Sequence, residues 1–252
     1  EGTDVELGPS LRKLATAATF NPYLPYLSFL CINFDTPVIR EAASWFLNGV
    51  FLNYNSSYLE RALEQMLDED DSPEVTRFLR AVDVRIDGFR VEKAAEEHRQ
   101  RVFVKHAVGG KDYELRLSEE SAGTQKLMGL ASFLLAALER GGTVVVDELD
   151  AKLHPKLLRY VILLFKDPEI NKNGAQLIFS SQDVSTMRND VFRRDEIWFA
   201  ARDEDAASQL WSLADIRETN GNLVSKNAAF DKQYLSGRYG ADPYLARIEE
   251  WD

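Results

Sequence analysis

The first third of the chain has the apolar spacing of helices. Apolar residues recur three and four positions apart over Val38–Asn48 and again over Tyr58–Leu67. Ser72 followed by Pro73 is a helix-start signal, because proline fits the first helical turn, where its missing N–H is not needed. These residues predict a set of short helices before Val84.

A period of two replaces the helical spacing between Val84 and Leu117. Apolar and polar residues alternate there, and Asp87-Gly88 and Gly109-Gly110 are turn signals. The pattern predicts a set of antiparallel strands.

After Leu117, helices and apolar strands alternate. The pattern predicts helices at Gln125–Leu138, Pro155–Phe165 and near Val184, and strands at Thr143–Val146, Ala175–Ser180 and Glu196–Ala200. Strands that are apolar on both faces and alternate with helices are typical of a parallel sheet flanked by helices, so the predicted fold class is α/β. The tail over Lys226–Trp251 predicts one or two helices, interrupted at Gly237 and Gly240.

Composition adds limits to this picture. The 252 residues are 45% hydrophobic and 28% charged, which is the balance of a globular protein. The net charge of −11 disfavours binding through a basic surface over the whole molecule, although it leaves room for a local basic groove. Cys31 is the only cysteine, which excludes an intrachain disulfide and predicts a reducing, cytoplasmic setting. The three histidines (98, 106 and 154) are too far apart in sequence for metal-ligand spacing.

The longest uncharged stretch runs from Leu14 to Phe34, but it contains Pro22 and Pro25. We expect a buried helical hairpin or a partner-facing segment there, and no membrane span. The chain starts at Glu1 without a signal-peptide pattern, so it is expected to be a piece of a longer protein.

Two adjacent carboxylates follow the buried strand Thr143–Val146. A parallel strand delivers the residues after its carboxyl end to the ligand-binding edge of the sheet. Asp147 would therefore face a magnesium–nucleotide complex, and Glu148 would polarise an attacking water. The alternative is that both acids are ordinary loop residues at a strand end.

A second candidate is the tetrapeptide Ser121, Ala122, Gly123 and Thr124, directly before a predicted helix. A serine N-cap, free amides and the positive end of the helix dipole make an anion site. Capping of the helix by Ser121 is the simpler alternative.

The order of these elements resembles the C-terminal lobe of ABC-class ATPases, including the chromosome-maintenance type. The similar segments are Ser121–Thr124 (signature loop), Val144–Glu148 (Walker B strand), Asp150–Pro155 (D-loop, with Asp150 and His154) and Leu177–Asp183 (switch loop, with Gln182). The resemblance covers Leu117 to Asp183.

A narrower resemblance is to bacterial predicted ATPases of anti-phage and abortive-infection loci. It rests on Asp147–Asp150 with Leu153–Pro155, on Ile197–Phe199 followed by Leu210–Leu213, and on Tyr234–Gly240. It implies that residues 1–83 are a helical insertion or lid, that 84–252 form the C-terminal ATPase lobe, and that the lobe with the Walker A loop precedes this chain.

The resemblance implies ATP and Mg²⁺ as cofactors and a homodimer, or a higher oligomer, that sandwiches ATP. Asp147 would hold the metal, Glu148 and Gln182 would be catalytic, and Ser121–Thr124, Asp150 and His154 would contact nucleotide. The expected partner is a protein effector of nuclease-like type, with DNA contact a secondary expectation. This sequence departs from the family in lacking G-x-x-x-x-G-K-[ST], in carrying Gln182 at the switch-histidine position, and in carrying His154 where many relatives have aspartate.

Two other functions remain open at this point. A Toprim-like nuclease could take a metal-binding acidic pair from Asp203-Glu204-Asp205, although an exposed hairpin tip explains those residues without function. A catalytically degenerate interaction module is the third reading, supported by Gln182 and by the missing phosphate loop.

Overall fold

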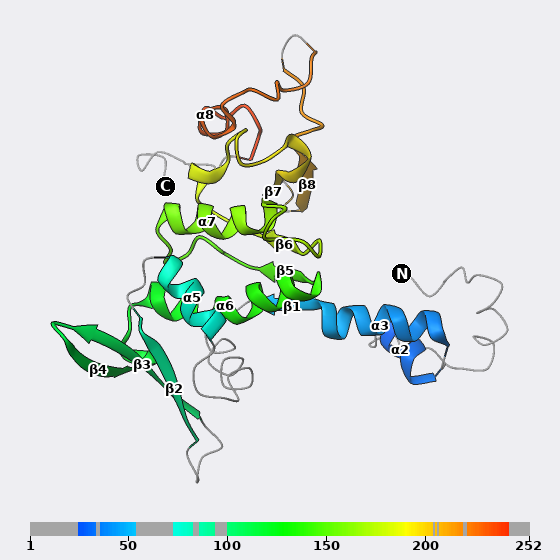
Figure 1. Ribbon diagram of the computed structural model, residues 1–252. Helices are drawn as coiled ribbons and strands as arrows, with labels where there is room; N and C mark the ends of the chain where they lie inside the picture. Colours follow the sequence, from blue (N-terminus) through cyan, green and yellow to red (C-terminus); the bar gives the residue numbers. More distant parts are fainter. Residues whose placement is uncertain are drawn as a thin grey trace, which may run out of the picture. The chain divides into compact units, whose positions relative to one another are not determined.

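The computed structural model describes residues 25–33, 36–53, 73–82, 86–93, 100–203, 205, 207–218 and 221–241 (Figure 1). The chain forms two compact units, one of residues 1–146 with 167–178 and the other of residues 147–166 with 179–252. The predicted helix at Tyr58–Leu67 lies outside the described residues, and so do residues 242–252 of the tail.

Helices in the first unit follow the predicted spacing or start signal, except for the first, which lies in the uncharged stretch Leu14–Phe34. They are α2 (Tyr26–Asn33), α3 (Pro37–Gly49), α5 (Pro73–Ala81) and α6 (Ala122–Arg140). Helix α5 packs against α6 and buries Phe78 and Leu79. In α6, Leu127, Leu130 and Leu134 are buried, so this helix contributes much of the apolar core of its unit. Within the described part of the chain, no helix is long and apolar enough to cross a membrane.

The predicted antiparallel strands are confirmed from Gly88 onward, whereas Val84, where the pattern began, lies outside the described residues. They form a sheet in the order β2 (Gly88–Lys93), β3 (Gln100–Val108) and β4 (Lys111–Arg116), and Gly109 and Gly110 turn between β3 and β4 with positive φ. The turn signal at Asp87-Gly88 was wrong, because Gly88 opens β2 and pairs with Lys105. The Asp87 carboxylate instead accepts a hydrogen bond from the Ala107 amide at 2.6 Å.

The central sheet has the order β1 (Val50–Asn53), β5 (Thr143–Val146) and β6 (Gln176–Phe179). Strands β1 and β5 are parallel, with Val50 opposite Thr143, so the α/β class is confirmed for one parallel pair. Strand β1 was not predicted, because four apolar-rich residues directly after a helix cannot be told from its last turn by periodicity.

The second unit contains α7 (Pro155–Lys166), β7 (Trp198–Arg202), β8 (Ser208–Ser212) and α8 (Phe230–Leu235). The prediction that Glu196–Ala200 adds a strand to the parallel sheet was wrong. Strand β7 pairs antiparallel with β8 in a separate sheet. The alternation of buried and exposed residues in β7 is the pattern of a hairpin with one wet face.

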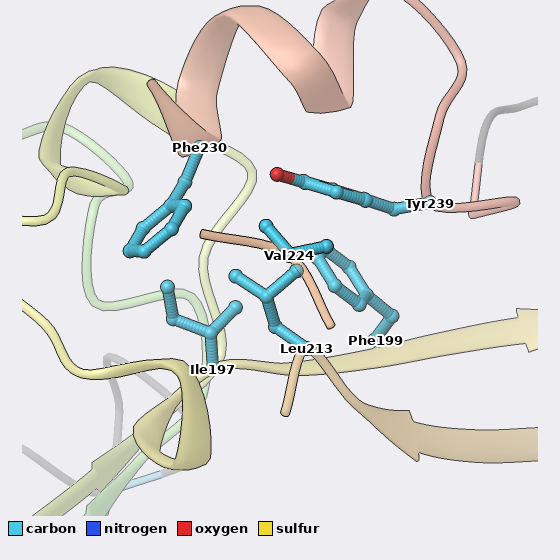
Figure 2. Packing of buried hydrophobic residues seen from close by; sticks show 6 residues of the cluster. All are labelled: Ile197, Phe199, Leu213, Val224, Phe230 and Tyr239. Carbon is cyan, nitrogen blue, oxygen red and sulfur yellow. The ribbon is translucent and has the colours of Figure 1, made fainter. Parts of the chain in front are cut away.

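A compact core holds this hairpin against the C-terminal segment. Figure 2 shows its buried members, which are Ile197, Phe199, Leu213, Val224, Phe230 and Tyr239. The Tyr239 hydroxyl bonds the Gln233 side chain at 2.7 Å, and the Tyr234 ring stacks on Phe199 at a centroid distance of 5.6 Å. The sequence Tyr234–Gly240 therefore folds back on the hairpin and has a packing role.

Candidate functional site

The acidic pair forms a tight turn directly after β5. Asp147 and Glu148 are both exposed, whereas the next residue, Leu149, is fully buried. Glu148 has a φ of 49°, in the left-handed region that costs a non-glycine residue about 1–2 kcal/mol. Backbone strain of this kind clusters at functional sites, so the glutamate at this position calls for an explanation.

Ser180, immediately after β6, binds the turn at three consecutive residues. Its hydroxyl donates to Asp147 Oδ1 at 2.5 Å and accepts from the Glu148 amide at 2.8 Å. Its carbonyl accepts from the Leu149 amide at 3.0 Å. The sequence analysis did not single out Ser180; the available signal was a hydroxyl residue at the end of an apolar strand.

Asp150 and Gln182 form a second link between the same two segments. The Asp150 carboxylate is half-buried and accepts a hydrogen bond from the Gln182 amide at 3.2 Å. The Gln182 side chain is exposed. The structure thus brings Asp147, Glu148, Asp150 and Gln182 into one cluster within the second unit.

His154 caps helix α7. Its Nδ1 accepts a hydrogen bond from the Lys156 amide at 3.1 Å, and its carbonyl accepts from the Leu157 amide at 2.8 Å. With Pro155 in the first helical position, these contacts satisfy amides that would otherwise lack partners. A capping role accounts for the side chain at this position, and nucleotide contact by His154 stays a prediction.

The loop before α6 lies in the first unit and is organised around its own hydroxyls. Ser121 is the N-cap, and its Oγ accepts from the Thr124 amide at 3.1 Å and contacts Thr124 Oγ1 at 2.8 Å. Ala122 and Ser121 are exposed, and Gly123 is half-buried. Ser121 therefore caps helix α6, as the simpler alternative predicted. The cap satisfies the Thr124 amide and leaves the amides of Ala122 and Gly123 available to an anion.

A partly buried pair fixes the residue just before this loop. His106 on β3 contacts Glu120 at 2.6 Å between Nε2 and Oε1. The Gln125 side chain also donates to the Glu120 carbonyl at 2.7 Å. Neither contact was predicted, since periodicity does not show which strand residue faces a loop 14 positions away.

The acidic turn offers the exposed carboxylate of Asp147 as a candidate Mg²⁺ ligand. Within the described residues, no group of three or more histidine, cysteine, aspartate or glutamate side chains is arranged to hold a metal. Mg²⁺ is commonly bound by one or two carboxylates, with waters and substrate phosphates as the other ligands. The exposed Asp147 carboxylate fits that mode.

Asp203 at the β7–β8 hairpin uses its carboxylate to close the turn. It accepts hydrogen bonds from the amides of Asp205 and Ala207 and from the Gln209 side chain. The Gln209 side chain, followed by the Ala207 amide, lowers the pKa of Asp203. These hydrogen bonds agree with the alternative in which Asp203 is part of an exposed hairpin tip and binds no metal.

Comparison with known proteins adds one family and one group of structures. The family described as "AAA domain, putative AbiEii toxin, Type IV TA system" (AAA_21) matches residues 9–188. No curated protein matches the chain.

Among solved structures, three Smc head domains are similar in fold. They are the Pyrococcus yayanosii head with a coiled coil and joint (17% identity, TM-score 0.40), an SmcHead bound to the C-winged helix domain of ScpA (16%, 0.45), and a Pyrococcus furiosus head with an extended coiled coil bound to the C-terminal domain of ScpA (18%, 0.35). The matches cover 64%, 66% and 56% of this chain and 28%, 55% and 34% of those chains, respectively.

Proposed function

The chain belongs to the AAA_21 family, and on that premise we propose that it is part of an ATP-hydrolysing switch that dimerises around ATP. The observation that carries the proposal is the acidic turn. Asp147 and Glu148 are adjacent and exposed, and Glu148 is kept at a φ of 49° where glycine would be less strained.

In this proposal the two carboxylates have different roles. Asp147 would hold Mg²⁺, which would supply neutralisation of the charge that develops during phosphoryl transfer. Glu148 accepts a proton from the attacking water. Asp150 and Gln182 lie beside them. In the proposal the Gln182 side chain donates a hydrogen bond to the γ-phosphate, and unlike a histidine it carries no charge that changes with pH.

The loop Ser121–Thr124 serves the dimer in the proposal. Free amides at the start of α6 and the helix dipole would contact the γ-phosphate held by the partner subunit. ATP then joins the subunits, and hydrolysis separates them. The sequence contains no G-x-x-x-x-G-K-[ST], so the proposal assigns the phosphate-loop role to no residue of 1–252.

The output of such a switch is a change of shape passed to a partner. A net charge of −11 favours a protein partner over nucleic acid, and we propose an effector of nuclease-like type in bacterial anti-phage defence. DNA contact is the secondary form of this proposal.

Glu148→Gln in the complete protein tests the central step. The amide keeps the size of the side chain but removes the base, so ATP binding and ATP-dependent dimerisation should persist while kcat falls about 10²- to 10⁴-fold. Binding is measured by calorimetry, dimer mass by light scattering and turnover by phosphate release. Glu169→Gln changes the same charge at an exposed residue outside the turn and should leave all three unchanged. A Glu148→Gln protein that hydrolysed ATP at the parent rate would disprove the assignment.

A further inference from the structure

Ser180 is the described residue that touches both members of the acidic pair. Its oxygen accepts from the Glu148 amide at 2.8 Å, and its hydroxyl hydrogen goes to Asp147 Oδ1 at 2.5 Å. A serine hydroxyl has one hydrogen to donate, and the amide can only donate. The two bonds therefore fix the direction of the hydroxyl without ambiguity.

The bond to Asp147 sets the rotation of that carboxylate. Among the described residues, Ser180 is the one hydrogen-bond donor to the Asp147 carboxylate, and it binds Oδ1. Oδ2 is left as the oxygen that can meet an external ligand. Because a carboxylate that rotates freely presents each oxygen in turn, the bond orders the group before a ligand arrives.

The bond from Glu148 supports the strained backbone. A residue at a φ of 49° needs its surroundings to hold it there, and an amide without a partner would add to the cost. The Ser180 oxygen supplies that partner. The Leu149 amide bond to the Ser180 carbonyl, 3.0 Å long, holds the next residue of the turn to the same serine.

We infer that Ser180 is a positioning residue for ATP hydrolysis, acting by ordering the Asp147 carboxylate that would hold the metal and by holding the backbone of Glu148. The inference rests on the proposed function. It assigns to Ser180 a role in metal use and turnover that is separate from nucleotide affinity.

The test compares Ser180→Ala, Ser180→Cys and Ser180→Thr in the complete protein. Alanine removes both bonds, cysteine keeps the volume but has a weak donor, and threonine keeps the hydroxyl. Hydrogen bonds to charged groups contribute about 1.5–3 kcal/mol, which corresponds to a fall in kcat of about 10- to 100-fold for alanine and cysteine. The Mg²⁺ concentration for half-maximal rate should rise severalfold, ATP affinity without Mg²⁺ should not change, and threonine should restore the rate.

Ser225→Ala is the matched control. Ser225 is an exposed serine of the same unit, outside the acidic turn and the loop that carries Gln182, and its hydroxyl accepts a hydrogen bond from the Asn227 amide at 3.2 Å. It should keep the parent kcat and the parent Mg²⁺ dependence.

Melting temperatures separate a positioning role from a folding role. If alanine lowers the melting temperature too far for assay, the cysteine variant decides the question, because it fills the same space. Parent values of kcat and Mg²⁺ dependence in the alanine or cysteine variant would overturn the inference. The proposed function would survive that result as long as Glu148→Gln still lowered kcat by about 10²- to 10⁴-fold, so the two failures are distinguishable.

Discussion

Glu148 should be replaceable by glycine with a gain in stability and a loss of function. Its φ of 49° costs a residue with a Cβ about 1–2 kcal/mol, which glycine avoids. Glycine also gives the unfolded chain more freedom, which costs about 0.4–1 kcal/mol. The net expectation for Glu148→Gly is a stabilisation of about 0.5–1 kcal/mol, or a melting-temperature rise of about 1–4 °C for a protein of this size.

Two variants isolate the backbone effect. Glu148→Ala removes the same carboxylate but keeps the Cβ, so it should not share the gain. Lys152→Gly relieves a φ of 65° four residues away without touching an acid of the candidate site, and it should give a similar gain. Thermal unfolding followed by circular dichroism, together with urea unfolding at pH 7, measures all three. If Glu148→Gly is no more stable than Glu148→Ala while Lys152→Gly is stabilised, the argument that backbone strain is stored at Glu148 is refuted.

Two further predictions concern positions away from the acidic turn. Gly141→Ala should destabilise the protein by about 2 kcal/mol or more, because φ is 74° and a Cβ would lie 2.4 Å from the Asn173 carbonyl oxygen; Gly110→Ala, with φ of 76° and no atom within 4 Å, should cost only the backbone term in the same urea titration. Burial raises the pKa of Tyr239 to about 12, so the folded state favours the neutral phenol, and that stability is complete below pH 10 and lost as pH rises toward 12. Tyr239→Phe should therefore be less stable at pH 7 by about 0.5–1.5 kcal/mol, through loss of the Gln233 bond, and the gap should narrow between pH 10 and 12; a gap that stays constant over that range would contradict the assignment.

Long elements with strong periodicity were predictable from the sequence. The helix over Gln125–Leu138 and the strand Thr143–Val146 appear as α6 and β5, because their apolar residues fill the core of one unit. Strand β1 was not predictable, since its parallel pairing with β5 joins residues about 90 positions apart and leaves no local trace. Strand β7 was assigned to the wrong sheet because an apolar run of residues does not show which strand it will pair with.

The acidic residues of the candidate site were predicted from the sequence, but the residues that hold them in position were not. Asp147 and Glu148 stand out because two carboxylates end a buried strand. Ser180 could not be singled out, because its importance lies in the direction of one hydroxyl and not in its residue type. The same holds for His106 and Glu120, whose contact depends on the register of β3. The grouping of residues 1–83 and 84–252 as lid and lobe stays a prediction.

The hairpin of β3 and β4 is packed along its ladder but, in the part of the chain that the structure describes, has no neighbours at its turn. Phe103 pairs with Arg116 at its base, and His106, which lies opposite Tyr113 in the middle of the ladder, contacts Glu120. At its tip, a Cβ added to Gly109 or Gly110 would meet no atom within 4 Å among the described residues. The tip is consequently a place to attach a fluorophore or insert an epitope, because a side chain that begins there meets no neighbouring atom of the described chain at its Cβ, while the register of the ladder ends at Arg116, before the start of α6. A dye at the tip could report on assembly of the protein without altering the residues proposed to carry out its chemistry.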